Sequence, residues 1–128
     1  MILGYRQMPA SQNDVATEFM NKVKTGDYTG AKSMLWDPKS PYGDLLDGNL
    51  EKLHVLLLKY PVPDFGKWNT EYDTAYLVKT KTFIIPIYKG FDQTNRLKEA
   101  RIEITFEYQG KHIGNAISSF RVFTLYDR

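Results

Sequence analysis

The first half of the chain places apolar residues at helical spacing. Val15, Phe19 and Val23 recur every four residues, which predicts one apolar stripe on an amphipathic helix. Ser11 and Asp14 form an S-x-x-D capping signature just before this stripe. We therefore expect the first helix to begin at Ser11.

A glycine and an aspartate separate this helix from a second, shorter one. Gly26 can adopt positive φ at little cost and is expected to end the first helix. Asp27 is expected to cap the second helix, which Pro38 and Pro41 end. The inner face of this helix is expected to hold Ala31, Met34 and Leu35.

A third helix follows a loop rich in proline, glycine and aspartate. Asn49 is expected to cap it, and Leu50, Leu53 and Leu57 line one face. Pro61 and the proline two residues later end the apolar run, which predicts that the helix stops there.

From Lys67 onward the apolar period changes from four to two, which is typical of strands. One alternating run covers residues 72–81 and is expected to continue as a strand through residues 83–87. Pro86 indicates an edge position or a bulge in that strand. Residues 90–95 are expected to form a turn or a short loop.

The strand pattern is clearest near the C-terminus. Charged and polar residues alternate there with Ile102, Ile104, Phe106 and Tyr108. We therefore expect one face of the sheet to pack against the core and the other to be exposed to solvent.

The last strand changes phase between Ile117 and Phe120, which predicts a bulge near Ser118 and Ser119. Before it, residues 109–111 are expected to make a hairpin turn.

Three helices followed by strands predict an α+β fold. We expect three N-terminal helices packed on a curved, mostly antiparallel four- to five-stranded sheet. With 128 residues, the chain has the length of one domain. We expect residues 11–128 to form that domain and residues 1–10 to be a disordered leader or a remnant of cloning.

Composition removes several kinds of chemistry. Cysteine is absent, which excludes disulfides, thiolate metal sites and cysteine nucleophiles. A zinc centre needs three or four convergent ligands, and the two histidines, His54 and His112, are expected to be solitary. No phosphate-binding or dinucleotide-binding glycine motif occurs, and no apolar run reaches the ~18 residues that span a bilayer. We expect no metal and no cofactor.

The opening of the chain resembles the nuclear-transport-factor-two-like superfamily, whose fold is also called cystatin-like. The resemblance is carried by residues 19–28, a helix followed by a Gly-Asp break, and by the short Ala/Leu helix after them. The closing hairpin, residues 101–125, is also similar, so the resemblance covers residues 11–126. It implies a cone-shaped half-barrel with a cavity between the curved sheet and the helices.

The chain most resembles small exported bacterial domains of unknown function, often attached to lipoproteins, which share the same opening pattern of helices. This resemblance implies an extracytoplasmic location at the bacterial surface, with membrane attachment only through an anchor that is not present in this chain.

The enzymes of the superfamily provide a test of catalysis. Phe19 stands where ketosteroid-isomerase-like members carry a tyrosine, and it lacks the hydroxyl donor. Asp37, the candidate general base, precedes a proline and suits a turn. Arg101 and Arg121 do not complete the Asp–Arg–Asp set of limonene-epoxide-hydrolase-like members, and residues 109–114 depart from the cystatin motif Gln-x-Val-x-Gly. We therefore expect that the protein is not an enzyme.

Aromatic residues are numerous, with seven Phe, nine Tyr and two Trp. They suit the lining of a pocket for small amphipathic molecules, but aromatic residues also favour strands and fill cores. The candidate pocket-lining residues are Phe19, Trp36, Tyr72, Tyr76, Phe106 and Tyr108.

Basic residues surround the middle strands, but acidic residues interrupt them, and the net charge is only +2. Nucleic acid is therefore not an expected partner. The leading hypothesis is a non-catalytic module, the soluble domain of an exported bacterial protein, that binds a partner protein or a small amphipathic ligand. The exposed sheet face could also support a homodimer. The alternatives are an oligomerising subunit of a bacterial conjugation or secretion channel, and a small-molecule enzyme that uses the cone cavity.

Overall fold

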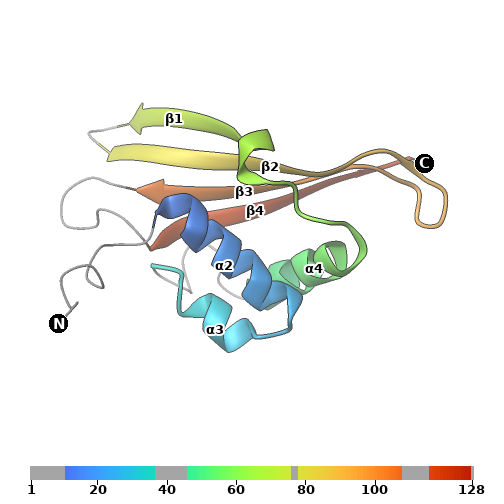
Figure 1. Ribbon diagram of the computed structural model, residues 1–128, viewed down its shortest axis with the longest axis horizontal. Helices are drawn as coiled ribbons and strands as arrows, with labels where there is room; N and C mark the ends of the chain where they lie inside the picture. The colour runs from blue at the N-terminus through green and yellow to red at the C-terminus, as the bar shows by residue number, and fades with distance from the viewer. Residues whose placement is uncertain (1–10, 37–45, 76–77, 108–115, 128) are drawn as a thin grey trace.

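Three helices precede a four-stranded antiparallel sheet in the part of the chain that the structure describes (Figure 1). This computed structural model describes residues 11–36, 46–75, 78–107 and 116–127. The elements are α2 (Gln12–Lys24), α3 (Tyr28–Lys32), α4 (Leu46–Lys59), a 3-10 turn η2 (Phe65–Lys67), β1 (Asn69–Ala75), β2 (Val78–Asp92), β3 (Leu97–Glu107) and β4 (Ile117–Tyr126). The α+β class is thereby confirmed.

Local capping interactions fix both ends of α2 as the sequence predicts. The Ser11 hydroxyl accepts a hydrogen bond from the Asp14 N–H at 3.4 Å and donates to the Asp14 carboxylate at 2.7 Å. At the other end, Gly26 adopts φ +84°. The Asp27 N–H then reaches back to the Lys22 carbonyl at 2.8 Å, which closes a Schellman motif.

The second helix is capped as predicted but is shorter than expected. The Asp27 carboxylate accepts a hydrogen bond from the Gly30 N–H at 2.9 Å. The helix ends at Lys32, and Leu35 instead forms a parallel bridge with Ile117 of β4. The expectation that Leu35 belongs to the helix is wrong, because its backbone pairs with the sheet.

The third helix begins earlier than predicted. It starts at Leu46, so Asn49 lies inside the first turn and is not its cap. Leu46 is buried and lies four residues before Leu50, so it extends the same apolar stripe by one turn. The helix ends at Lys59, ahead of Pro61, as expected.

The long alternating run at residues 72–81 is two strands and not one. β1 and β2 pair antiparallel, with Ala75 opposite Val78 and Tyr72 opposite Lys81. The chain therefore reverses between Ala75 and Val78. The prediction of a single strand is wrong because a reversal with paired strands keeps the alternation of side chains intact.

Two predicted irregularities of the sheet are confirmed. The pairing of β2 with β3 shifts between Pro86 and Tyr88, which makes a bulge inside a central strand. In β4, Ile117 pairs with Phe106 and the next paired residue is Ser119, so Ser118 is the extra residue of a bulge. The turn expected at residues 90–95 begins later, because β2 continues to Asp92 and β3 starts at Leu97.

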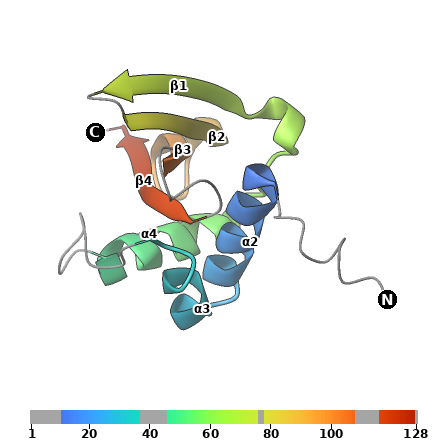
Figure 2. The same ribbon diagram turned by 90° about the vertical axis from the view of Figure 1, so that its left-hand side faces the viewer.

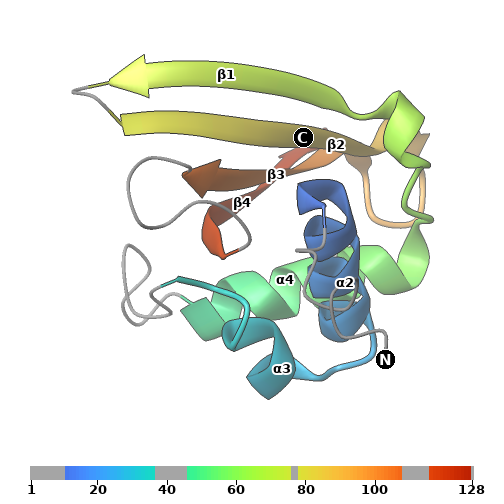
Figure 3. The same ribbon diagram turned by 60° about the vertical axis from the view of Figure 1, so that its left-hand side comes forward.

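All three helices lie on one side of the sheet (Figures 2 and 3). The Phe19 ring of α2 packs on Phe120 of β4, with ring centroids 5.1 Å apart, and both are buried. No polar side chain of the described residues is buried, and the opposite sheet face carries charged and polar groups, as the alternation in β3 predicts. The largest fully buried side chains are Phe19, Phe83, Phe106, Phe120, Met20, Leu50, Leu53, Leu57, Ile85, Leu97, Ile102 and Ile104.

Candidate functional site

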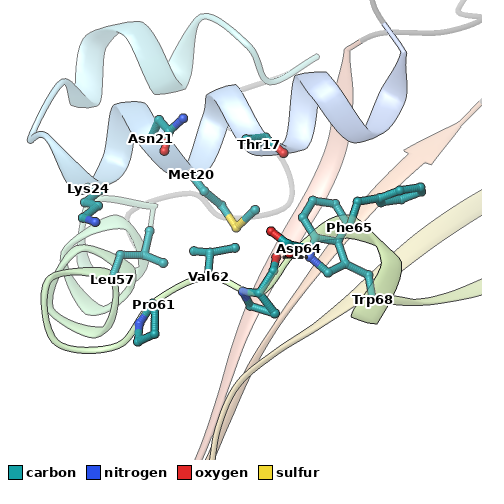
Figure 4. Close-up of a pocket in the computed structure, with 11 residues that line it drawn as sticks. Thr17, Met20, Asn21, Lys24, Leu57, Pro61, Val62, Asp64, Phe65 and Trp68 are labelled. Atoms are coloured by element: carbon teal, nitrogen blue, oxygen red, sulfur yellow. Dashed lines mark hydrogen bonds between the residues drawn. The ribbon is translucent and has the colours of Figure 1, made fainter.

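A groove of about 430 Å³ lies between α2 and the segment that connects α4 to β1 (Figure 4). We call it the α2 groove. Its size falls within the ~300–1,000 Å³ of typical small-molecule sites. The residues that line it are Thr17, Met20, Asn21, Lys24, Leu57, Pro61, Val62, Pro63, Asp64, Phe65 and Trp68.

The connecting segment is held against α2 by its prolines and by Trp68. Pro61 and Pro63 prevent α4 from continuing and keep the backbone extended. The Trp68 indole N–H donates to the Pro63 carbonyl at 2.9 Å, which anchors the ring. Phe65 meets Trp68 edge to face, at 5.2 Å between ring centroids, and remains 47% exposed.

The α2 groove has an apolar floor and a polar rim. Met20, Leu57 and Trp68 are the buried residues of the lining. Lys24 and Asp64 bring one positive and one negative charge to the same lining, and both residues are exposed. Such a surface can take the apolar body of a small molecule while charged or hydrogen-bonding groups meet its polar end.

The predicted pocket-lining residues lie elsewhere. Phe19 and Phe106 are fully buried core residues, and Phe106 packs edge to face on Phe83 at 5.8 Å. Phe19 thus has neither a hydroxyl donor nor access to solvent.

Trp36 and Tyr72 are exposed at 42% and 67%, on separate parts of the molecule. Tyr76 and Tyr108 lie outside the described residues. A shared pocket for these aromatic residues stays a prediction.

From the sequence, Pro61 and Pro63 are expected to end a helix, and Trp68 is one of several aromatic residues of the strand half that could line a pocket. A signal was nevertheless present, because two prolines, a phenylalanine and a tryptophan follow α4 within nine residues. Such a segment is extended and rich in aromatic area, but the sequence does not say which helix it packs against.

A second polar cluster joins the end of α4 to the turn between β2 and β3. The Asp92 carboxylate accepts hydrogen bonds from the Tyr60 hydroxyl at 2.5 Å and the Lys59 ammonium at 3.0 Å. It also accepts from the Thr94 hydroxyl at 2.6 Å and the Thr94 N–H at 2.9 Å. We call these four residues the Asp92 clasp.

The electrostatics of the Asp92 clasp are those of a structural joint. Hydrogen bonds from Thr94, Tyr60 and Lys59 hold the pKa of Asp92 well below its usual range. Burial raises the pKa of Tyr60, and the hydrogen bond to Asp92 raises that of Lys59. Each group is thereby kept in its ordinary charge state at neutral pH, and none is poised to exchange a proton.

The remaining candidate groups are also paired. The Tyr28 hydroxyl donates to Glu51 at 2.6 Å, and its burial together with that carboxylate raises the pKa of Tyr28 to about 12. The His54 ring lies edge to face against Tyr28 at 5.9 Å. Its Nδ1 lies 2.9 Å from the Val23 carbonyl oxygen, to which it donates a hydrogen bond.

The two arginines considered for catalysis lie on the sheet face opposite the helices. Arg101 lies between Glu99 and Glu103, at 3.0 Å from each, and its guanidinium stacks on Phe123 at 4.0 Å. Arg121 lies 3.7 Å from Glu103. Asp37, His112 and residues 109–114 lie outside the described part of the chain.

No family model, no curated protein and no solved structure matches this chain. Within the described ranges, no helix is long and apolar enough to cross a bilayer. Those same ranges hold no group of three or more His, Cys, Asp or Glu side chains placed to hold a metal ion.

Proposed function

We propose that this protein is a non-catalytic binding module that holds a small amphipathic molecule in the α2 groove. The observation that carries the proposal is the shape and lining of the groove. A buried floor of Met20 and Leu57 lies under a rim that carries Lys24 and Asp64, in a hollow of about 430 Å³. A molecule with an apolar body and a charged end matches both parts.

The lining favours binding over catalysis. Acid–base or nucleophilic chemistry requires several titratable groups that converge on one reacting atom. Among the eleven lining residues, Lys24 and Asp64 are the only charged ones, and both are exposed to solvent. These two charged groups can orient a ligand. Because both are exposed, water also hydrogen-bonds to them, and they are not held in place to act on a reacting atom.

The wider setting is part of the same proposal and rests on the resemblance of the opening helices and the closing hairpin. On that basis we propose that the sheet belongs to a cone-shaped half-barrel of the nuclear-transport-factor-two-like superfamily. The same resemblance supports an extracytoplasmic location.

The chain offers a direct test, because it contains only two tryptophans. In a Trp36→Phe background, Trp68 of the groove is the single indole. We expect the amphipathic anion 8-anilinonaphthalene-1-sulfonate to bind saturably and to receive excitation energy from Trp68. Filling the groove with Asn21→Phe is expected to weaken this binding at least tenfold.

The matched control is Glu18→Phe, which adds the same ring to an exposed position of α2 that does not line the groove. It is expected to leave the titration unchanged. Cooperative unfolding of each variant must be verified, because partly folded states also bind this dye. Equal binding by both phenylalanine variants would rule out the groove as the site. Native mass spectrometry of the gently purified protein would then identify the natural ligand by its mass.

A further inference from the structure

The strand β1 has a free edge. It pairs with β2 on one side only, and no described segment lies beyond it (Figures 1, 2 and 3). The Thr74 N–H donates to the Asp73 side chain at 2.8 Å and so does not bind β2. Because peptide groups alternate in direction along a strand, the peptide groups of Thr70 and Tyr72 also face outward. A row of outward peptide groups is a template for another strand.

Two acidic side chains flank this edge on one sheet face. Glu71 and Asp73 lie opposite Thr82 and Thr80 of β2, and both acidic residues are exposed. None of the ion pairs formed among the described residues includes either carboxylate. One face of the edge is therefore negative, and no basic side chain of the described residues neutralises it.

The other face of the edge is aromatic. Tyr72 is 67% exposed and lies opposite Lys81, whose ammonium is 5.9 Å from the ring centroid. A residue added beside Tyr72 would meet an open apolar surface next to a positive charge. This face therefore favours an apolar neighbour and disfavours a basic one.

These charges disfavour a second copy of the chain as the natural occupant. Two copies related by a two-fold axis would pair their β1 strands antiparallel. Registers that centre the contact between Glu71 and Asp73 place Glu71 opposite Asp73 of the copy, or Glu71 opposite Glu71, or Asp73 opposite Asp73. Like charges directly opposite each other destabilise a pair of strands.

We propose that the β1 edge binds an extended segment of another protein in which two basic residues flank one apolar residue. The basic residues meet Glu71 and Asp73, and the apolar residue packs beside Tyr72. The backbone of the segment adds a fifth strand to the sheet, a mode in which main-chain hydrogen bonds give affinity and alternate side chains give specificity. This interaction is separate from the α2 groove.

The probe is the acetylated and amidated peptide Thr-Val-Lys-Ile-Lys-Val-Thr, titrated into the ¹⁵N-labelled protein. We expect NMR shift changes confined to β1 and its neighbours on β2, with slower hydrogen exchange at the amides of Thr70 and Tyr72. The same peptide with glutamate in place of both lysines is expected not to bind. Shifts in the α2 groove alone, or equal binding of both peptides, would overturn the proposal.

Two pairs of variants distinguish the contribution of charge to peptide binding from that of the backbone hydrogen bonds. Glu71→Gln is expected to weaken the lysine peptide by about 1.5- to 5-fold, the range for one cross-strand ion pair, while the exposed Glu18→Gln on α2 has no effect. Tyr72→Pro removes an outward N–H and is expected to abolish binding, whereas Tyr72→Val keeps it.

If Tyr72→Pro binds as tightly as Tyr72→Val, or Glu71→Gln as tightly as the unmodified protein, the edge is not the binding site. Shifts at β1 that grow with protein concentration in the absence of peptide would show that a second copy is the occupant, and would also overturn the proposal.

Discussion

The Asp92 carboxylate, at the end of β2, receives four hydrogen bonds from three residues that lie in two separate parts of the fold. Lys59 is the last residue of α4 and Tyr60 follows it directly, whereas Thr94 belongs to the turn after β2. The Asp92 side chain is only 14% exposed. Because the carboxylate is satisfied only in the folded protein, its ionisation and the folding equilibrium are linked.

The Asp92 clasp predicts a loss of stability in acid. The folded pKa of Asp92 lies below the unfolded value of about 3.9, so its contribution is fully present above that value. It is lost as the pH falls through the folded pKa. In urea unfolding between pH 2 and 6, Asp92→Asn is expected to lower the midpoint at pH 6 and to flatten its decline below pH 4.

The control for this measurement is Asp47→Asn, which removes an exposed carboxylate whose ion-pair partner among the described residues is Lys32. It is expected to follow the pH profile of the unmodified protein. If Asp92→Asn declines as steeply as the unmodified protein below pH 4, the clasp does not govern acid stability.

At the scale of elements, the bulge at Ser118 reconciles two parts of β4. Ile117 and Phe120 are both buried, although they are three positions apart along a strand whose side chains alternate with a period of two. The extra residue places both side chains on the helix side of the sheet. Ile117 also donates its N–H to the Met34 carbonyl at 3.0 Å, which ties the start of β4 to the segment that follows α3.

Deleting Ser118 is therefore expected to cost at least about 3 kcal/mol in the free energy of unfolding. The deletion forces either Ile117 or Phe120 onto the solvent-exposed face of the sheet. Exposing or removing a large core side chain costs about 2–5 kcal/mol. Urea denaturation measures the change. Ser118→Ala, which keeps the residue count and loses only the hydroxyl bond to Glu107 at 2.7 Å, is expected to cost about 1 kcal/mol. Equal effects of the two changes would contradict this account of the bulge.

The elements that the sequence predicts well are those set by local signals. Ser11, Asp27 and Gly26 mark helix ends through hydrogen bonds within a few residues of themselves. The reversal between β1 and β2 is missed because the residues between the strands, Tyr76 and Leu77, are not of the types that usually mark turns.

The α2 groove is missed for a different reason. It exists because the segment after α4 folds back onto α2, and no local pattern encodes which distant surface that segment meets. The aromatic content of the chain correctly suggests apolar surface, but most of the aromatic residues chosen from it, such as Phe19 and Phe106, either fill the core or lie away from the groove.

Across the whole molecule, the strands differ in how firmly they are held. β3 has a paired neighbour on each side and alternate buried residues along its length. β1 has one neighbour, and its residues from Asn69 to Thr74 are all exposed. Local opening of an element requires less free energy when few buried contacts hold it.

We therefore expect a gradient of hydrogen exchange across the sheet. Amides of β1 that bind β2 should exchange through local opening, and amides at the centre of β3 only through global unfolding. Native-state exchange measured by NMR at several low urea concentrations distinguishes the two, because only global opening depends strongly on urea. Equal protection and equal urea dependence in β1 and β3 would contradict the gradient.

The contact between Phe19 and Phe120 also constrains how the protein is made. The ribosome synthesises the helices first, and their apolar faces then have no sheet to cover them. At a synthesis rate of ~5–20 residues per second, the strands emerge several seconds after the helices. A nascent chain that stops before β4 leaves Phe19 without its packing partner, so chaperones and proteases meet an open helical layer. We therefore expect the apolar face of α2 to stay accessible to proteases until β4 has been synthesised and Phe120 can pack on Phe19.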